Sequence, residues 1–210
     1  ICACLVGSEM CIRDRLKGAG VNLKYYTYQK YPENDKVHFL YLGRIMKEKG
    51  MDELFYAAKE LQRKEVPFVL DLVGFFEDEY KEKIDKLVDA GIAVFHGFQE
   101  DPRPYYAMAD CVVLPSYHEG MSNVLLEAAA TGRPVITSNI PGCKEAVDDG
   151  KSGLLCEAED WNDLYRKMSK IAQMSRIERE AMGVCGRDKM AREFDKDKVV
   201  KKTIQGIERV

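Results

Sequence analysis

Short apolar runs alternate with longer amphipathic segments through most of this 210-residue chain. The apolar runs occupy residues 37–43, 68–74, 92–96, 111–115, 134–138 and 154–156. They are continuously apolar rather than alternating, which is typical of strands that carry helices on both faces. A repeated strand–helix order predicts a parallel sheet with right-handed crossovers. We therefore expect an α/β fold built on a six-stranded parallel sheet.

The segments between these runs have a helical pattern. In residues 51–64, Leu54, Ala57, Ala58 and Leu61 recur at the spacing of one helix face. Further helices are expected at 77–90, 102–109, 123–131 and 143–147. From residue 160 onward the chain is helical in pattern, with breaks near 174–175 and 194–195. A helical C-terminal part therefore follows the sheet.

Composition excludes several classes of protein. A hydrophobic content of 46% and a charged content of 32% are ordinary for a globular protein. The net charge of −3 gives no electrostatic footprint for nucleic acid, and no apolar run reaches the length needed to span a bilayer. The seven cysteines include no CxxC pair, so free cytosolic thiols are favoured over a disulfide scaffold or a zinc site. His96 and His118 are too few and too separated for a metal site, and no metal is expected.

The first residues differ from the rest. Residues 1–15 hold three of the seven cysteines and have no helical or strand period. The stretch LVGSEMCIRDR, residues 5–15, resembles the translation of a sequencing-library adapter. We expect residues 1–15 to be an assembly artefact in front of a truncated longer protein, and the alternative is a natural N-terminal arm. Residues 16–36 contain a small-residue turn, then a polar and aromatic stretch that is typical of a linker.

The most informative stretch is SYHEGMSNVLLEAAATGRP, residues 116–134. A strand end, a tight loop and a helix N-terminus point unpaired backbone N–H groups and the helix dipole outward, which favours an anion. Ser122 or Asn123 is the expected N-cap. Glu119 lies in the loop, and Glu127 lies in the apolar helix. A carboxylate in such a helix needs a partner, either vicinal ribose hydroxyls, as in dinucleotide sites, or a buried arginine.

Two cations follow the first strand. A guanidinium at Arg44 matches two phosphate oxygens and an ammonium at Lys49 adds a point charge, so together they suit a diphosphate. The alternative is an ordinary solvated loop. Because parallel strands bind ligands at their carboxyl ends, Arg44, Gly74, Gly97 and Glu119 should meet at one sheet edge. No G-x-G-x-x-G or Walker A motif follows any strand, which argues against a simple dehydrogenase or a P-loop NTPase.

Four segments carry a family resemblance: FLYLGRIMKEKG (39–50), VFHGF (94–98), ADCVVLPSYHEGMSNVLLEAAATGRPVI (109–136) and IPGCKEAVDDGKSGLL (140–155). They resemble the C-terminal, donor-binding domain of a retaining GT-B glycosyltransferase of family 4, most of all the bacterial enzymes of capsule, exopolysaccharide and lipid-linked glycan synthesis. The resemblance covers residues 18 to about 200. It implies a Rossmann-like donor-binding domain over 37–175, an interdomain junction and linker over 16–36, and C-terminal helices over 176–210.

The resemblance also implies roles for individual residues. Arg44 and Lys49 would bind the donor diphosphate and Glu119 the transferred sugar, which makes these three the catalytic set. The implied donor-binding residues are Gly120, Met121, Ser122 and Asn123 through backbone amides, Glu127 on the ribose, and Gly74, His96, Gly97 and Phe98 beside the base. The implied donor is UDP-hexose or UDP-N-acetylhexosamine, and the implied acceptor is a glycan or a polyprenyl-diphosphate-linked glycan. The implied location is the cytoplasm or the inner face of the cell membrane, without cofactor or essential metal.

An acceptor-binding N-terminal domain is absent from this chain, so we expect it to be weakly active or inactive alone. Two other functions remain open: a non-catalytic nucleotide-sugar binding module, and half of a hydrolysing nucleotide-sugar epimerase. The retained Arg44, Lys49, Glu119 and Glu127 favour the transferase.

Overall fold

A six-stranded parallel sheet forms the centre of the molecule, as predicted. The computed structural model describes residue 18 and residues 20–207, so the artefact predicted at residues 1–15 lies outside the described part. The strands are β1 (Val37–Leu42), β2 (Phe68–Val73), β3 (Ala93–Gly97), β4 (Cys111–Leu114), β5 (Val135–Ser138) and β6 (Gly153–Cys156). Their order is β3-β2-β1-β4-β5-β6, and every neighbouring pair is parallel. The order reverses direction between β1 and β4, which places the expected ligand crevice there.

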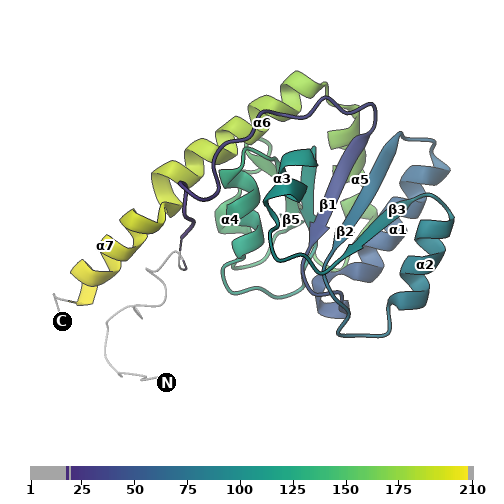
Figure 1. The fold of residues 1–210 in the computed structure, drawn as a ribbon, viewed down its shortest axis with the longest axis horizontal. Coiled ribbons are helices and arrows are strands. Elements are labelled where there is room, and N and C mark those ends of the chain that lie inside the picture. The colour runs from purple at the N-terminus through teal and green to yellow at the C-terminus, as the bar shows by residue number, and fades with distance from the viewer. Residues whose placement is uncertain (1–17, 19, 208–210) are drawn as a thin grey trace.

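Helices cover both faces of the sheet. They are α1 (Met51–Arg63), α2 (Lys81–Asp89), α3 (Arg103–Met108), α4 (Asn123–Ala130), α5 (Trp161–Gln173), α6 (Arg176–Lys189) and α7 (Lys196–Ile207), with short turns η2 (Lys47–Lys49), η3 (Lys144–Ala146) and η4 (Met190–Phe194). The crossover helices α1 and α2 lie on one side with α5, while α4 lies on the other with α6 (Figure 1). α7 projects away from the sheet (Figure 1). None of the described helices is long and apolar enough to cross a membrane.

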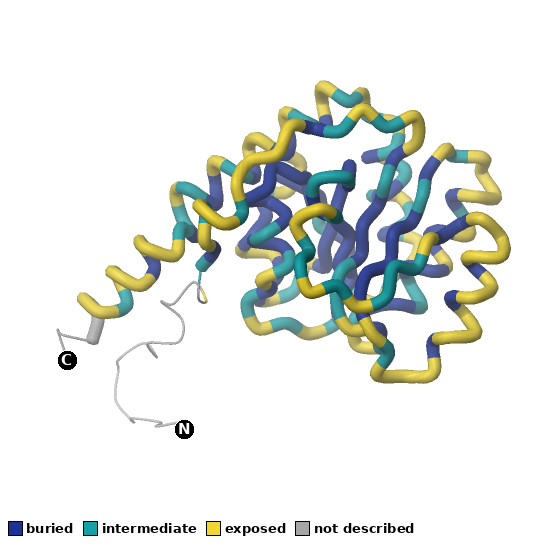
Figure 2. Tube along the Cα trace, in the orientation of Figure 1, coloured by how far each residue is buried: buried dark blue, intermediate teal, exposed yellow. Residues whose placement is uncertain are grey.

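The buried core follows the strands and α4 (Figure 2). α4 is apolar almost all round, and it is held between the sheet and α6. Gly183 of α6 makes this approach possible, because a Cβ there would lie 2.0 Å from the carbonyl oxygen of Gly132. The turn after α4 and helix α6 therefore meet through a close backbone contact that a side chain at residue 183 would block.

Helix α2 begins later than predicted. The sequence pattern placed its start at residue 77, but the helix begins at Lys81. The backbone N–H groups of Glu77 and Asp78 donate to the carbonyl of Ile45, at 3.1 and 3.4 Å. These bonds pull residues 74–80 against the loop after β1, so this stretch cannot start a helix. The helix predicted at 143–147 is the single turn η3.

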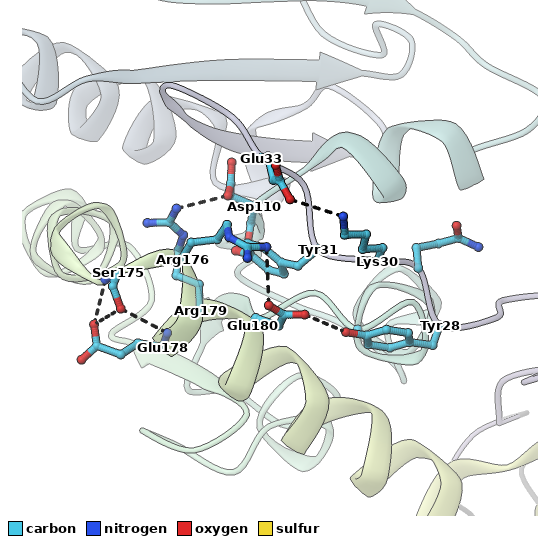
Figure 3. Close-up of polar contacts among 12 residues, drawn as sticks. Tyr28, Lys30, Tyr31, Glu33, Asp110, Ser175, Arg176, Glu178, Arg179 and Glu180 are labelled. Carbon is cyan, nitrogen blue, oxygen red and sulfur yellow. Dashed lines mark hydrogen bonds and ion pairs between the residues drawn. The ribbon is translucent and has the colours of Figure 1, made fainter.

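Residues 21–36, which we call the strap, have neither helix nor strand but are fastened to the domain. The guanidinium of the fully buried Arg133 donates to the carbonyls of Gln29 and Lys30 at 3.1 and 3.0 Å. Figure 3 shows further polar contacts of the strap, which include the 3.3 Å hydrogen bond from the Tyr28 hydroxyl to Glu180. Tyr31 is buried and donates to the carbonyl of Asp110. The strap is therefore an ordered layer of this domain, whereas the domain boundaries stay predictions.

The start of the strap lies beside the start of α7. The Val21 N–H donates to the carbonyl of Phe194 at 2.8 Å, and the Lys196 N–H donates to the carbonyl of Val21 at 3.0 Å. Val21 and Asp195 thus form a parallel bridge. Two segments that are far apart in sequence enter and leave the domain side by side.

Candidate functional site

The carboxyl edge of the sheet brings together Lys49 and Glu119, 70 residues apart in sequence. The Lys49 Nζ lies 2.7 Å from the Glu119 Oε1, and each side chain is only 15% exposed. The Ser116 hydroxyl donates to the same oxygen at 3.0 Å. Lys49 ends the turn η2, and a Cβ on the following Gly50 would lie 2.1 Å from the carbonyl oxygen of Pro115. Gly50 therefore lets the loop after β1 rest directly on the loop after β4.

Arg44 lies at the end of β1 and pairs with Glu77. Its Nη1 is 3.0 and 3.2 Å from the two carboxylate oxygens. The Tyr41 hydroxyl donates to the carbonyl of Arg44 and fixes the backbone there. Gly74 lets the loop after β2 pack directly on the loop after β1, since a Cβ there would lie 1.8 Å from the Gly43 carbonyl oxygen. Each of the two cations predicted from the sequence thus has a carboxylate partner.

The N-terminus of α4 faces this edge. Ser122 is the N-cap, one of the two predicted positions, but its side chain forms no capping hydrogen bond. Its N–H donates instead to the carbonyl of Gly142 at 3.1 Å. The amides of Gly120, Met121 and Asn123 have no hydrogen-bond acceptor among the described residues. Three of the four predicted backbone donors therefore remain available to an anion.

Gly142 holds the loop before α4 in place. It has a φ of 88°, and a Cβ there would lie 1.6 Å from the carbonyl oxygen of Gly120. Its N–H donates to Glu145 Oε2 at 2.8 Å. The loop after β5 is therefore packed against the loop after β4, next to the peptide that joins Gly120 to Met121.

Glu127 lies one helical turn further along α4 and has tyrosine partners. The hydroxyl of the fully buried Tyr106 donates to its Oε2 at 2.9 Å, and the Tyr26 hydroxyl also interacts with it. Burial raises the pKa of Glu127, and the two tyrosine hydroxyls partly offset this rise. The buried arginine weighed as an alternative partner is wrong, because Arg133 in this region donates only to backbone carbonyls.

His96, predicted beside the base, belongs to a chain of three side chains across neighbouring strands. Asp71 of β2 is only 2% exposed, and its two oxygens lie 2.8 Å from His96 Nε2 and 2.7 Å from His38 Nδ1. The hydrogen bond to Asp71 raises the pKa of His38. The His96 ring also meets Tyr105 edge-on, with centroids 5.0 Å apart. Asp71 therefore fixes the ring that precedes Gly97 at the end of β3.

Phe98 follows Gly97 and is 66% exposed. It forms an edge-to-face pair with Phe75, whose ring centroid is 6.0 Å away. The two rings come from the loops after β3 and β2. Gly74 and Gly97 are joined by a hydrogen bond of 2.9 Å from the Gly74 N–H to the Gly97 carbonyl. The residues predicted to border a base thus gather at the β2–β3 end of the sheet edge.

Sequence reasoning missed four residues of this region: Asp71, Glu77, Tyr26 and Tyr106. Asp71 had a usable signal, since an acid in the middle of the apolar strand FVLDLV requires a buried partner. Glu77 was assigned to a helix that begins four residues later. The two tyrosines lie in the strap and in α3, and nothing local in the sequence links them to Glu127.

The chain is similar in sequence and in fold to known glycosyltransferases. The family described as "Glycosyl transferases group 1" matches residues 36–174. The capsular polysaccharide biosynthesis glycosyltransferase CapM of Staphylococcus aureus is 31% identical over 166 residues, which cover 77% of this chain and 43% of that protein. Sucrose-phosphate synthase from Thermosynechococcus elongatus has a TM-score of 0.77 at 27% identity, covering 90% of this chain and 51% of that one.

A solved structure of HepE from Anabaena in complex with UDP has a TM-score of 0.78 at 18% identity, covering 91% of this chain and 56% of that one. At that identity the likeness concerns the fold. The chain spans about half the length of these relatives, with 43%, 51% and 56% of their chains covered. The chain belongs to the group 1 glycosyltransferases, and its fold is that of a GT-B Rossmann-like C-terminal domain.

Proposed function

We propose that this domain binds a nucleotide-diphosphate sugar, with UDP-hexose or UDP-N-acetylhexosamine as the donor. The observation that carries the proposal is the largely buried Lys49–Glu119 pair, 2.7 Å apart, in front of the unpaired amides at the start of α4. A cation, a carboxylate and free N–H groups in one place suit a ligand that carries both phosphates and hydroxyls. The UDP complex of HepE, a protein of the same fold, supports the nucleotide class.

In the whole protein, we propose, the site serves retaining glycosyl transfer of the family 4 type to a glycan or a polyprenyl-diphosphate-linked acceptor. Arg44 and Lys49, with the amides of Gly120 and Met121, would hold the diphosphate and stabilise the negative charge that develops on it as the sugar leaves. Because two side-chain cations supply this charge, the proposal uses no metal. The reaction would take place in the cytoplasm, at the inner face of the membrane when the acceptor is lipid-linked.

The carboxylates would recognise hydroxyl groups. Glu119, fixed by Lys49 and Ser116, would accept hydrogen bonds from the transferred sugar. Glu127, held by Tyr106, would accept them from the ribose. Gly74, His96, Gly97 and Phe98 would border the base. In this arrangement the protein supplies position and charge, and no protein nucleophile is needed.

Calorimetry tests the proposal. The chain is titrated with UDP, GDP and ADP, with the corresponding sugar nucleotides, and with uridine. We expect UDP and UDP-sugars to bind and uridine, which lacks the diphosphate, to bind far more weakly. Lys49→Gln should weaken UDP binding strongly, whereas Lys59→Gln, an exposed lysine of α1, should not. If none of the nucleotides binds, the donor-site assignment is wrong.

Two other functions predict different results. A non-catalytic binding module would bind the donor but transfer no sugar, even when joined to an acceptor-binding domain. A hydrolysing epimerase half would, in its full-length form, release UDP from a UDP-sugar without an acceptor. We expect the present chain alone to turn over little or no donor, and a rate near that of full-length relatives would refute this.

A further inference from the structure

A cavity lies between the strap, the start of α3 and the end of α4. It has a volume of about 270 Å³ and includes Tyr25, Tyr26, Gln29, Asp101, Arg103 and Thr131 in its lining. Among its lining residues, Tyr26 also contacts a residue of the proposed donor site, Glu127. Aromatic rings, a hydroxyl, an amide, a carboxylate and a guanidinium thus line one small hollow.

Hydrogen bonds between the lining segments hold the walls of this cavity in place. The Arg133 guanidinium donates to the carbonyl of Gln29 on the strap side at 3.1 Å and to that of Ala107 on the α3 side at 2.8 Å. The Gln29 N–H donates to the carbonyl of Thr131 at 3.1 Å, which joins strap and α4. Because both walls are already held together, a ligand would not have to order them, and less of the binding free energy is lost.

The charges in the lining cancel. Asp101 accepts two hydrogen bonds from Arg103, at 2.8 Å from Nε and 2.7 Å from Nη2. The guanidinium lies 4.2 Å from the centroid of the Tyr25 ring and stacks over it. A paired guanidinium has no net charge to offer a phosphate, so the cavity does not favour an anion. It offers planar hydrogen-bonding groups beside an exposed aromatic ring.

These features match a neutral ring that carries hydroxyls on its edge and C–H groups on its face. We propose that this cavity binds one sugar unit of a glycan, separately from the nucleotide-sugar donor. Hydroxyl groups can both donate and accept, so they can pair with Asp101, Arg103 and Gln29 at once. The apolar face of the sugar would lie against Tyr25, which is 46% exposed.

The cavity also adjoins the donor site through one side chain. Tyr26 lines the cavity, and its hydroxyl interacts with Glu127. A sugar in contact with Tyr26 would therefore alter the interaction between Tyr26 and Glu127. This part of the inference rests on the proposed function. Binding in the cavity itself does not depend on it.

Nuclear magnetic resonance of the ¹⁵N-labelled chain tests the inference. The probes are methyl α-glucoside and methyl N-acetylglucosaminide, with glycerol as an acyclic polyol, each raised to about 10 mM to fill a site of millimolar affinity. We expect saturable shifts of the Thr27, Gln29 and Ala107 amides with at least one glycoside and none with glycerol. Tyr25→Ala should weaken that binding about tenfold, and Tyr56→Ala, another exposed tyrosine, should leave it unchanged.

Each other outcome decides against the cavity or against the donor site. No saturable shifts with either glycoside, the same shifts with glycerol, or equal binding by Tyr25→Ala would overturn the sugar site. Arg103→Gln provides a second variant, which removes the stacked guanidinium and should also weaken glycoside binding. UDP binding by Tyr25→Ala should match that of the unaltered chain. If glycosides bind but UDP does not, the proposed donor function fails and the sugar site stands.

Discussion

In the proposed donor site, Glu77 would compete with the diphosphate for Arg44. Its two oxygens lie 3.0 and 3.2 Å from Arg44 Nη1, where a diphosphate oxygen would have to sit. If Arg44 binds the diphosphate as proposed, binding would have to displace Glu77 from the guanidinium. The substitution Glu77→Gln removes the competing charge and keeps the shape of the side chain. We expect it to tighten the binding of UDP.

The size of the effect follows from exposure. The side chains of Arg44 and Glu77 are 49% and 35% exposed, so solvent screens their attraction. Exposed ion pairs contribute about 0.2–1 kcal/mol, which corresponds to an affinity gain of about 1.4-fold to fivefold. Uridine, which lacks the diphosphate, should bind equally to the unaltered chain and to Glu77→Gln. The gain should shrink as salt is added.

Calorimetric titration measures the affinity of each protein for UDP and for uridine. Glu79→Gln is the matched control, since it removes the same charge from the same loop and Glu79 has no ion-pair partner among the described residues. Weaker UDP binding by Glu77→Gln would contradict the competition. If Glu79→Gln gained as much affinity for UDP, the cause would be the loss of negative charge from the loop and not the loss of the Arg44–Glu77 ion pair.

Two predictions concern the stability of the domain. Arg133→Lys should lower the free energy of unfolding by up to about 2–6 kcal/mol, because an ammonium cannot span the carbonyls on both sides and at least two partly buried acceptors lose their donor, at up to about 1–3 kcal/mol each. Urea denaturation measures the loss, and a loss no larger than that of the exposed control Arg103→Lys would contradict the role of Arg133. The hydrogen bond to Asp71 raises the pKa of His38, so its stabilisation is complete below the unfolded pKa of about 6.5 and is lost as the pH rises through the higher folded pKa. The difference in unfolding free energy between the unaltered chain and His38→Gln should therefore fall from about pH 6 upward. Asp110 and His96 also face this cluster, and they are the same in both proteins. A difference that stays constant with pH would refute the role of Asp71.

The sheet and its ligand edge could be predicted because their signals are local. Apolar runs such as 111–115 identify strands whatever their neighbours are, and parallel strands necessarily present their carboxyl ends together. That rule predicts that the loops after β1 and β4 lie at one edge, and the structure places Lys49 of the first loop 2.7 Å from Glu119 of the second. Local signals also placed the break between α5 and α6, where Ser175 caps the next helix.

The remaining features depend on contacts between distant segments. Glu127 needed a partner, but its tyrosine comes from α3, 21 residues earlier. The start of α2 is displaced by the carbonyl of Ile45, which no helix pattern contains. Arg133 lies just beyond α4, and no local pattern indicates that its side chain fastens the strap. Side-chain pairing of this kind is decided by tertiary packing, so periodicity and spacing do not reveal it.

Val21 lies beside residues 194–196, so a segment near the start of the described chain runs next to one near its end. The Val21 N–H donates to the carbonyl of Phe194, and the Lys196 N–H donates to the carbonyl of Val21. A short peptide could therefore join these points, and new ends could be opened at the exposed turn around Glu65, between α1 and β2. Such a circular permutant should keep its sheet order and its Lys49–Glu119 pair, because neither depends on where the chain is cut.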